Sequence, residues 1–246
     1  MHKRRAARPA AARPSGAKAA VAQASQLTSR ALCALLRTAD SSLLEDDGGD
    51  GRSLLLPELR LSIARPSELS FEEQDALFAL LETNMRALYE TSKSGWDAAE
   101  KRGEMYDPAS RFLLLRPRDA GVASTLGGFL LFRFDTERCA IADPDGRAGG
   151  LVEVGYCYEL QVDAASRGAG LGKVLMRHFE ALALHAGMRK TMLTVFTSNE
   201  CARRFYRHIG YGEDAITPAR TLGPGESLSD YDYEILSRPL DWRGSR

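Results

Sequence analysis

One segment of the chain constrains the fold more than any other, because a strand-like run leads into a glycine-rich turn and then into an amphipathic helix. The run is ELQVD at 159–163, the turn is RGAGLGK at 167–173, and apolar residues at helical spacing follow at Leu171, Val174, Leu175, Phe179 and Leu182. Free N–H groups at a helix start form an anion site, and glycines let a phosphate approach the backbone closely. The segment predicts a phosphate-binding loop, although the same glycines would also serve a tight strand-to-helix turn.

The spacing of these glycines argues against two common nucleotide-binding motifs. Lys173 follows the wrong glycine interval for the pattern GxxxxGK[ST], so a nucleotide P-loop is not predicted. No GxGxxG opens a Rossmann unit near the start of the chain either. A different phosphate-containing ligand is therefore expected.

The composition excludes several protein classes. The 246 residues are 44% hydrophobic and 27% charged, as in a folded domain. No run approaches the ~18 apolar residues of a membrane span, and no apolar stretch follows a charged start as in a secretory signal. The four cysteines form no CxxC pair. Neither a disulfide framework nor a metal site is predicted, and we expect reduced, intracellular thiols.

The net charge of zero hides an asymmetry between a basic arm and an acidic body. Residues 1–39 hold eight Lys and Arg residues and no acid, which leaves 25 basic against 33 acidic residues from Asp40 onward. An acidic body favours a cationic partner, although surplus acids also keep a domain soluble. Residues 1–16 are rich in Ala, Arg and Pro and predict a disordered arm. Nuclear import, a plain solvated tail and an organelle transit peptide all remain open for this arm.

The remaining chain predicts a mixed α/β domain without internal repeats. Residues 17–50 are expected to form a helical extension, with a helix over 17–38 and a flexible break at 46–51. Residues 51–240 form the main domain. Its expected strands are 58–65, 111–116, 125–135, 151–162, 191–196 and 231–237, and its expected helices are 70–90, 171–186 and 201–209.

The glycine-rich loop and the segments after it resemble the GNAT superfamily of N-acetyltransferases, which bind acetyl-CoA. Arg-x-x-Gly-x-Gly at 167–172 resembles the superfamily's pyrophosphate-binding loop, and the run ARRFYRHIGY at 202–211 resembles its A-x-x-[FL]-Y-x-x-x-G-[FY] signature. The resemblance implies a mostly antiparallel mixed sheet flanked by helices. It also implies acetyl-CoA as co-substrate, with no metal. The implied cofactor-binding residues are Leu160, Gln161, Val162, Arg167, Gly168, Ala169, Gly170, Leu171, Gly172, Lys173, Asn199 and Tyr206.

Residues 58–238 are more narrowly similar to the NatD-type protein N-terminal acetyltransferases. The similar segments are 83–85, 89–90, 95–96, 100–102, 104–105, 132–135, 156–159, 192–196 and 233–238. This resemblance implies transfer of acetyl to the N-terminal serine of histone four and histone two-A, whose mature tails begin Ser-Gly-Arg-Gly. Histone tails are the implied partner, without an obligate auxiliary subunit, and the implied location is nucleus and cytoplasm. The connection at 140–150 is longer than the family hairpin, and 217–229 is weakly patterned.

Catalysis of this transfer needs a base that collects the proton of the attacking amine. Glu159 is the candidate, because it precedes the cofactor-binding strand segment, and a bulge there would turn it toward the amine. The alternative for Glu159 is a salt bridge on the sheet surface. Tyr206 matches the superfamily tyrosine near the CoA sulfur, which protonates the leaving thiolate. Asn199 is expected either to bind the pantetheine arm or to cap the helix after it.

Acidic and aromatic residues are the candidates for binding the substrate. Asp135 and Glu137 end a strand, where they would receive the α-amine and an Arg side chain or simply face solvent. Aromatic residues are expected to line a narrow slot or to pack in the core, namely Tyr89, Trp96, Tyr156, Tyr158 and Tyr233. Two rival functions stay open. One is a GNAT enzyme for lysine side chains or small amines, and the other is a non-catalytic adaptor that binds nucleic acid through its basic arm.

Overall fold

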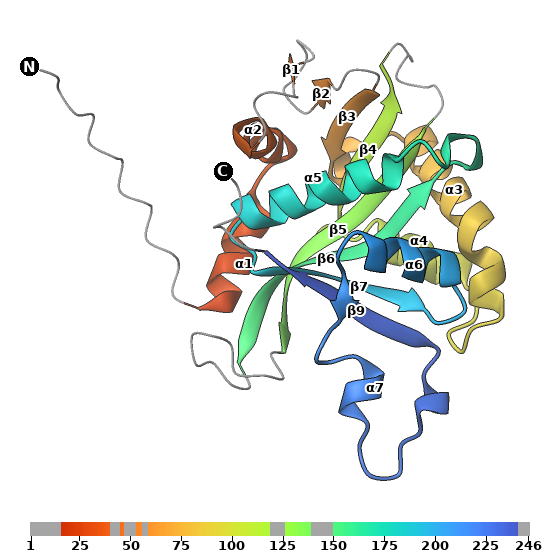
Figure 1. Ribbon diagram of the computed structural model, residues 1–246. Coiled ribbons are helices and arrows are strands. Elements are labelled where there is room, and N and C mark those ends of the chain that lie inside the picture. Colours follow the sequence, from red (N-terminus) through yellow and green to blue (C-terminus); the bar gives the residue numbers. More distant parts are fainter. Residues whose placement is uncertain are drawn as a thin grey trace, which may run out of the picture.

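The computed structural model describes residues 16–39, 45–46, 53–55, 59–118, 126–138 and 150–240. In these residues one nine-stranded sheet has the order β1-β2-β3-β4-β5-β6-β7-β9-β8 (Figure 1). The strands are β1 (Glu45–Asp46), β2 (Ser53–Leu55), β3 (Leu59–Ala64), β4 (Arg111–Pro117), β5 (Gly128–Arg138), β6 (Leu151–Val162), β7 (Lys190–Phe196), β8 (Gly212–Glu213) and β9 (Tyr233–Pro239). Only β6 and β7 pair in parallel within this part of the chain, so the predicted mixed, mostly antiparallel sheet is confirmed.

Helices cover both faces of the sheet. They are α1 (Ala17–Gln26), α2 (Ser29–Ala39), α3 (Phe71–Glu90), α4 (Ala98–Met105), α5 (Leu171–His185), α6 (Glu200–His208) and the short α7 (Pro218–Thr221). The first core joins α1, α2, α5 and α6 to one face, and the second joins α3 and α4 to the other. Because β4 lies between the two cores, Leu113 and Leu114 are both buried on opposite faces. No helix in the described part of the chain has the length and apolar character needed to cross a membrane.

Helix α3 begins where its sequence predicts. The Ser70 hydroxyl accepts a hydrogen bond from the Glu73 N–H (3.2 Å), and the Glu73 carboxylate accepts one from the Ser70 N–H (3.1 Å). This reciprocal capping satisfies two N–H groups that a helix start leaves without partners. The predicted helix over residues 70–90 is confirmed.

The single helix predicted over residues 17–38 is wrong at its centre, where the structure has a break between α1 and α2. Leu27 has an extended backbone with φ −60° and ψ 126°. Arg65 Nη2 donates to the Leu27 carbonyl (2.8 Å), and Arg111 Nη2 donates to the Ser25 carbonyl (2.9 Å). Cations are favourable at a helix C-terminus because its last carbonyls lack partners and carry the negative end of the dipole. Contacts with distant residues therefore stabilise an early end of α1.

The structure has one helix that the sequence does not predict, and some predicted features lie outside the described residues. The sequence predicts no helix over residues 98–105, whereas α4 forms there, and Asp97 Oδ1 accepts hydrogen bonds from the Ala99 and Glu100 N–H groups. The predicted arm lies outside the described residues except for Gly16. The predicted break at 46–51 lies outside them apart from its first residue, and so does the connection at 140–150 apart from its last.

Candidate active site

A bulge in β6 places Glu159 on the face of the sheet that α3 and α4 cover. Leu131 of β5 pairs with Glu159, but Phe132 pairs with Cys157, so Tyr158 is an extra residue in β6. Side chains alternate along a regular strand, and one extra residue reverses the alternation beyond it. Tyr158 and Glu159 therefore both face the same side. The bulge expected from the sequence is present.

The same region opens a gap between two strands. The parallel pairing of β6 and β7 ends at Cys157 and Leu193, and β7 continues to Phe196 with β9 as its partner. The end of β6 pairs there with β5 alone among the described residues. A cavity of about 520 Å³ lies at this divergence.

The cavity brings together most of the predicted catalytic and substrate-binding residues. Of the site residues predicted from the sequence, those that line the cavity are Tyr89, Asp135, Glu137, Tyr156, Tyr158, Glu159, Leu160, Gln161, Asn199, Tyr206 and Tyr233. Trp96 is not among its lining residues and instead packs against the ring of Tyr89, with ring centroids 5.7 Å apart. The cavity is also lined by residues that the sequence analysis did not propose, including Ser94, Lys101, Glu104 and Thr194.

Glu159 is a buried carboxylate with two close partners. Its side chain is 5% exposed, its Oε1 lies 3.0 Å from Lys101 Nζ, and its Oε2 accepts a hydrogen bond from Gln161 Nε2 (2.8 Å). Burial raises the pKa of Glu159, while Lys101 and Gln161 oppose that rise. Each carboxylate oxygen has two acceptor positions, so Glu159 keeps capacity for a further hydrogen bond.

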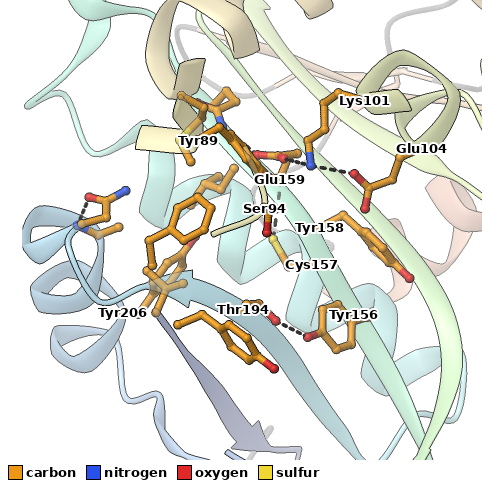
Figure 2. A pocket seen from close by; sticks show the side chains of 18 of the residues that line it. Tyr89, Ser94, Lys101, Glu104, Tyr156, Cys157, Tyr158, Glu159, Thr194 and Tyr206 are labelled. Carbon is orange, nitrogen blue, oxygen red and sulfur yellow. Dashed lines mark hydrogen bonds and ion pairs between the residues drawn. The ribbon is translucent and has the colours of Figure 1, made fainter. Parts of the chain in front are cut away.

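Lys101 and Glu104 come from one turn of α4 and meet Glu159 at the cavity wall, as Figure 2 shows. Lys101 Nζ lies 2.6 Å from Glu104 Oε2 and 4.8 Å from the centroid of the Tyr89 ring. Burial raises the pKa of Tyr89 to about 12. In the sequence, Lys101 stands in a charged segment, 100–102, that stands out only for its resemblance to the NatD-type enzymes, and a charged run by itself indicates a solvated surface.

Tyr206 lies on the opposite side of the cavity from α4 (Figure 2), and Asn199 also lines the cavity. Burial raises the pKa of Tyr206 well above its usual value, and nearby Cys157 and Glu159 add to that rise. The Tyr206 hydroxyl therefore keeps its proton at neutral pH. Asn199 Oδ1 accepts a hydrogen bond from the Ala202 N–H (3.1 Å), so Asn199 caps α6, one of its two expected roles.

The glycine-rich loop forms the start of α5, next to the end of β6. Gly168 and Gly170 have φ angles of +80° and +79°, which favour glycine, and nothing would lie within 4 Å of an added Cβ at either. The first N–H that donates within α5 is that of Val174, to the Gly170 carbonyl (3.1 Å). The preceding N–H groups of the first turn lack helical acceptors and suit an anion. Gly172 allows the start of α5 to pack closely against Phe205 of α6, because an added Cβ would lie 3.3 Å from Phe205 Cζ.

Arg167 ties this loop to α3. Its Nη2 donates a hydrogen bond of 2.6 Å to Asn84 Oδ1. Asn84 Nδ2 in turn donates to Gln161 Oε1 (3.0 Å) and to the Val162 carbonyl (3.2 Å). Hydrogen bonds thus run without interruption from Arg167 through Asn84 and Gln161 to Glu159.

Acidic and aromatic groups surround the other end of the cavity. Asp135 and Glu137 of β5 pair with Val154 and Val152 of β6, so the two acids lie on one face of the sheet, near the end of β5, where Asp135 is exposed and Glu137 is partly exposed. The Tyr156 hydroxyl is 2.6 Å from Thr194 Oγ1. With Glu104 and Glu159, these acids give the cavity four carboxylates against the one ammonium of Lys101. Such a charge balance favours a cationic ligand.

His178, His185 and Cys157 have structural surroundings. Nδ1 of His178 lies 2.7 Å from the Val174 carbonyl within α5, and His185 makes the equivalent contact with Ala181 (2.8 Å). Burial raises the pKa of the Cys157 thiol, which keeps it protonated and argues against a nucleophile. No cluster of metal-ligating side chains occurs in the part of the chain that the structure describes.

Comparisons with known proteins agree with this arrangement. The sequence model of the Acetyltransferase (GNAT) family matches residues 77–211. A mycothiol acetyltransferase of Mycobacterium marinum is 35% identical over 162 residues, covering 61% of this chain and 48% of that protein. N-alpha-acetyltransferase 40 of Saccharomyces cerevisiae is 32% identical over 108 residues, covering 41% of this chain and 36% of that protein. The chain spans about half or less of the length of these curated relatives.

Solved structures agree on the fold. The structure of an acetyltransferase from Streptococcus agalactiae has a TM-score of 0.50 and 14% identity, covering 73% of this chain and 98% of that one. At this identity the likeness shows the fold alone. The family match spans more than half of the chain and includes most of α3, the bulged strand β6, the glycine-rich loop and α6. The chain therefore belongs to the GNAT family of acetyltransferases, whose acetyl donor is acetyl-CoA.

Proposed function

We propose that the protein transfers acetyl from acetyl-CoA to the N-terminal α-amine of a protein chain, with histone tails that begin Ser-Gly-Arg-Gly as substrates. The observation that carries this proposal is the cavity, where carboxylates and tyrosines surround the buried base candidate Glu159. A Ser-Gly start has little side-chain bulk, which suits entry between Tyr156, Tyr158 and Tyr233. The free α-amine and the third-position Arg supply two positive charges for the acids at its rim.

The residues of the loop fit acetyl-CoA. The two left-handed glycines leave open space before the free N–H groups of α5, which suits a pyrophosphate. Arg167 and Lys173 add positive charge to this loop. Among the described residues, no second strand pairs with β6 at Leu160–Val162 where β7 diverges, so backbone groups there other than the Val162 carbonyl, which Asn84 and Arg167 hold, suit the pantetheine amides. When bound, acetyl-CoA supplies an activated acetyl thioester.

Glu159 is proposed to accept the proton of the attacking amine, directly or through one water. An α-amine has a pKa of about 8 and a lysine side chain one of about 10.4, so a carboxylate more readily deprotonates the α-amine. Tyr206 is proposed to donate its Oη proton to the leaving sulfur, since the hydroxyl stays protonated and Tyr206 lines the same cavity as Glu159. Burial of both groups keeps bulk water away from the proton transfers.

A second candidate function is acetylation of a small amine, favoured by the relative named for mycothiol. Mass spectrometry of the acetylated products distinguishes the candidates. A peptide that begins Ser-Gly-Arg-Gly is expected to gain one acetyl group at its α-amine, and the same peptide with a blocked α-amine to gain none. Acetylation of the blocked peptide at lysine, or turnover of small amines alone, would contradict the proposal.

A non-catalytic adaptor would show no turnover with any of these acceptors. It would bind DNA in a salt-dependent way that is lost without residues 1–16.

Action on histones in the nucleus and cytoplasm is part of the main proposal. Residues 1–16 then serve as an import signal, which a reporter fused with and without them would test.

A further inference from the structure

The ammonium of Lys101 is held between two carboxylates at the wall of the cavity. Lys101 Nζ lies 3.0 Å from Glu159 Oε1 and 2.6 Å from Glu104 Oε2, and the Lys101 side chain is only 11% exposed. The Tyr89 ring lies 4.8 Å from the same nitrogen, which adds a cation–π contact. A buried ammonium at the reaction centre of an acetyltransferase needs an explanation, since it competes with a cationic substrate for Glu159 and Glu104.

We propose that Lys101 is a positioning residue, whose ammonium keeps the Glu159 carboxylate ionised and oriented as a base, while Glu104 weakens that hold. The inference rests on the proposed role of Glu159. It names two residues that act through Glu159, and neither was assigned a role by sequence.

The chemistry of a buried acid supports this assignment. A carboxylate that is removed from water and left alone becomes protonated, and a protonated acid cannot accept a proton from an amine. The groups that face Glu159 are Tyr89 from α3, Lys101 and Glu104 from α4, Cys157 and Gln161 from its own strand, and Tyr206 from α6. Lys101 is the one cation among them, so it carries most of the stabilisation of the ionised form.

Glu104 keeps the pair from becoming too tight. Burial alone would lower the pKa of Lys101, but the carboxylates of Glu159 and Glu104 outweigh it and raise the pKa. Lys101 therefore stays charged. Because Glu104 shares that charge and itself repels Glu159, it raises the pKa of Glu159. Removal of the Lys101 cation should therefore raise the pKa of Glu159, and removal of the Glu104 carboxylate should lower it.

The position of α4 fixes this geometry. Asp97 caps the helix, and the Lys101 N–H donates to the Asp97 carbonyl (3.0 Å). Met105 at the end of α4 is fully buried in the second core. Arg133 Nη2 donates to the Glu104 carbonyl (2.5 Å), which ties the last turn to β5. Lys101 is thus held at the carboxylate by a rigid element rather than by a loop.

A titration of Glu159 in the full-length protein without ligands tests the inference independently of activity. The carboxyl carbons are labelled with ¹³C, and the Glu159 resonance is identified by its loss in Glu159→Gln. In Lys101→Met we expect the titration midpoint to rise by about one pH unit or more, as for loss of an opposite charge within ~4–6 Å. In Glu104→Gln we expect the midpoint to fall. The Lys101→Arg variant is expected to restore most of the wild-type midpoint.

The pH dependence of kcat/KM with the Ser-Gly-Arg-Gly peptide is the second readout. Since only ionised Glu159 accepts the proton, its loss of ionisation in Lys101→Met moves the acidic limb to higher pH. On the acidic limb, below the wild-type midpoint, activity should fall about tenfold for each pH unit by which the midpoint rises, and it should recover toward pH 9. The control is Lys190→Met, which removes an equally buried ion pair with Asp214 (2.5 Å) away from the cavity. It should lower Tm without moving the limb.

The outcomes separate this inference from the proposed function. If the Glu159 midpoint is the same in Lys101→Met, Glu104→Gln and wild type, the inference is wrong, even when the peptide is a good substrate. If both variants move the midpoint in the same direction, the shared-cation arrangement is wrong. If the peptide is not acetylated but the midpoints move in opposite directions, the inference holds and the proposed substrate is wrong. Glu104 is half-exposed on α4, so Glu104→Gln is expected to fold. If Lys101→Met fails to fold, the midpoint of Glu159 in Glu104→Gln alone tests the inference.

Discussion

Arg167 in the glycine-rich loop donates a 2.6 Å hydrogen bond from Nη2 to Oδ1 of Asn84, a residue of α3 that is 83 positions away in the chain. Asn84 also holds the end of β6 through Gln161 and the Val162 carbonyl. One side chain of α3 thus fixes both the proposed phosphate loop and the strand that carries the proposed base.

Replacement of Asn84 by alanine should loosen the loop and weaken acetyl-CoA binding. The lost hydrogen bonds are worth about 1–2 kcal/mol, or about 5- to 30-fold in Kd. Isothermal titration calorimetry measures this affinity without any acceptor substrate. Thr83→Ala is the matched control, because Thr83 is the exposed neighbour in the same helix. Equal affinities for the two variants would remove Asn84 from the support of the loop.

Gly170→Glu should abolish acetyl-CoA binding while the fold persists. The added carboxylate would lie at the start of α5, where it repels phosphate by about 4 kcal/mol at ~4 Å in a partly screened site, or by at least 100-fold in Kd. The left-handed backbone, with φ +79°, adds a strain of about 1–2 kcal/mol.

Gly187→Glu is the control for that strain and charge. Gly187 follows the other end of α5, has φ +90° and also has open space around it. It should lose a similar amount of stability in a thermal melt and keep its acetyl-CoA affinity. Unchanged binding by a folded Gly170→Glu protein would place the cofactor elsewhere.

Glu159→Gln should lower kcat by about 10²–10⁴-fold, the usual contribution of a general base. Acetyl-CoA affinity should stay within about twofold, since the amide keeps the shape of the side chain. Glu153→Gln removes a carboxylate of the same strand that is nearly as buried but does not line the cavity, so it should keep wild-type kcat. A Glu159→Gln enzyme within about threefold of wild type would assign the proton to a different acceptor.

Selectivity for a third-position Arg should depend on Asp135 and Glu137, which face the same side of β5 at the cavity. Replacement of that Arg in the peptide by Ala should cost about 1.5–3 kcal/mol in kcat/KM, as for a hydrogen bond to a charged group. In the Asp135→Ala/Glu137→Ala enzyme the same peptide change should cost much less. The four combinations form a double-mutant cycle.

The control for this cycle is Glu82→Ala/Glu90→Ala, which removes two carboxylates from α3 outside the cavity. This pair should leave the cost of the peptide change as in wild type. Additive losses for Asp135 and Glu137 would show that these acids do not read the Arg, and substrate selectivity would then come from other residues.

The features that the sequence predicted depend on neighbouring residues. Ser70 with Glu73 predicts the start of α3, and the capping contacts form within four residues. Gly170 predicts the left-handed turn into α5 because the required φ belongs to a single residue. Glu159 was identified because the motif after it has a fixed order along the chain. The apolar stripe of α3 even contained a signal for Asn84, a polar residue at a core-facing position.

The missed features depend on residues that approach from distant elements. Lys101 lies in α4, which has few apolar residues, so no periodicity indicated that its ammonium is buried beside Glu159. The break between α1 and α2 was missed because the guanidiniums that stabilise it belong to Arg65 and Arg111. Local propensity and side-chain spacing thus determined the elements and the loop. The partners of each buried charge were decided only by tertiary packing, because the free energy of an ion depends on which groups replace its water, and those groups are far away in the sequence.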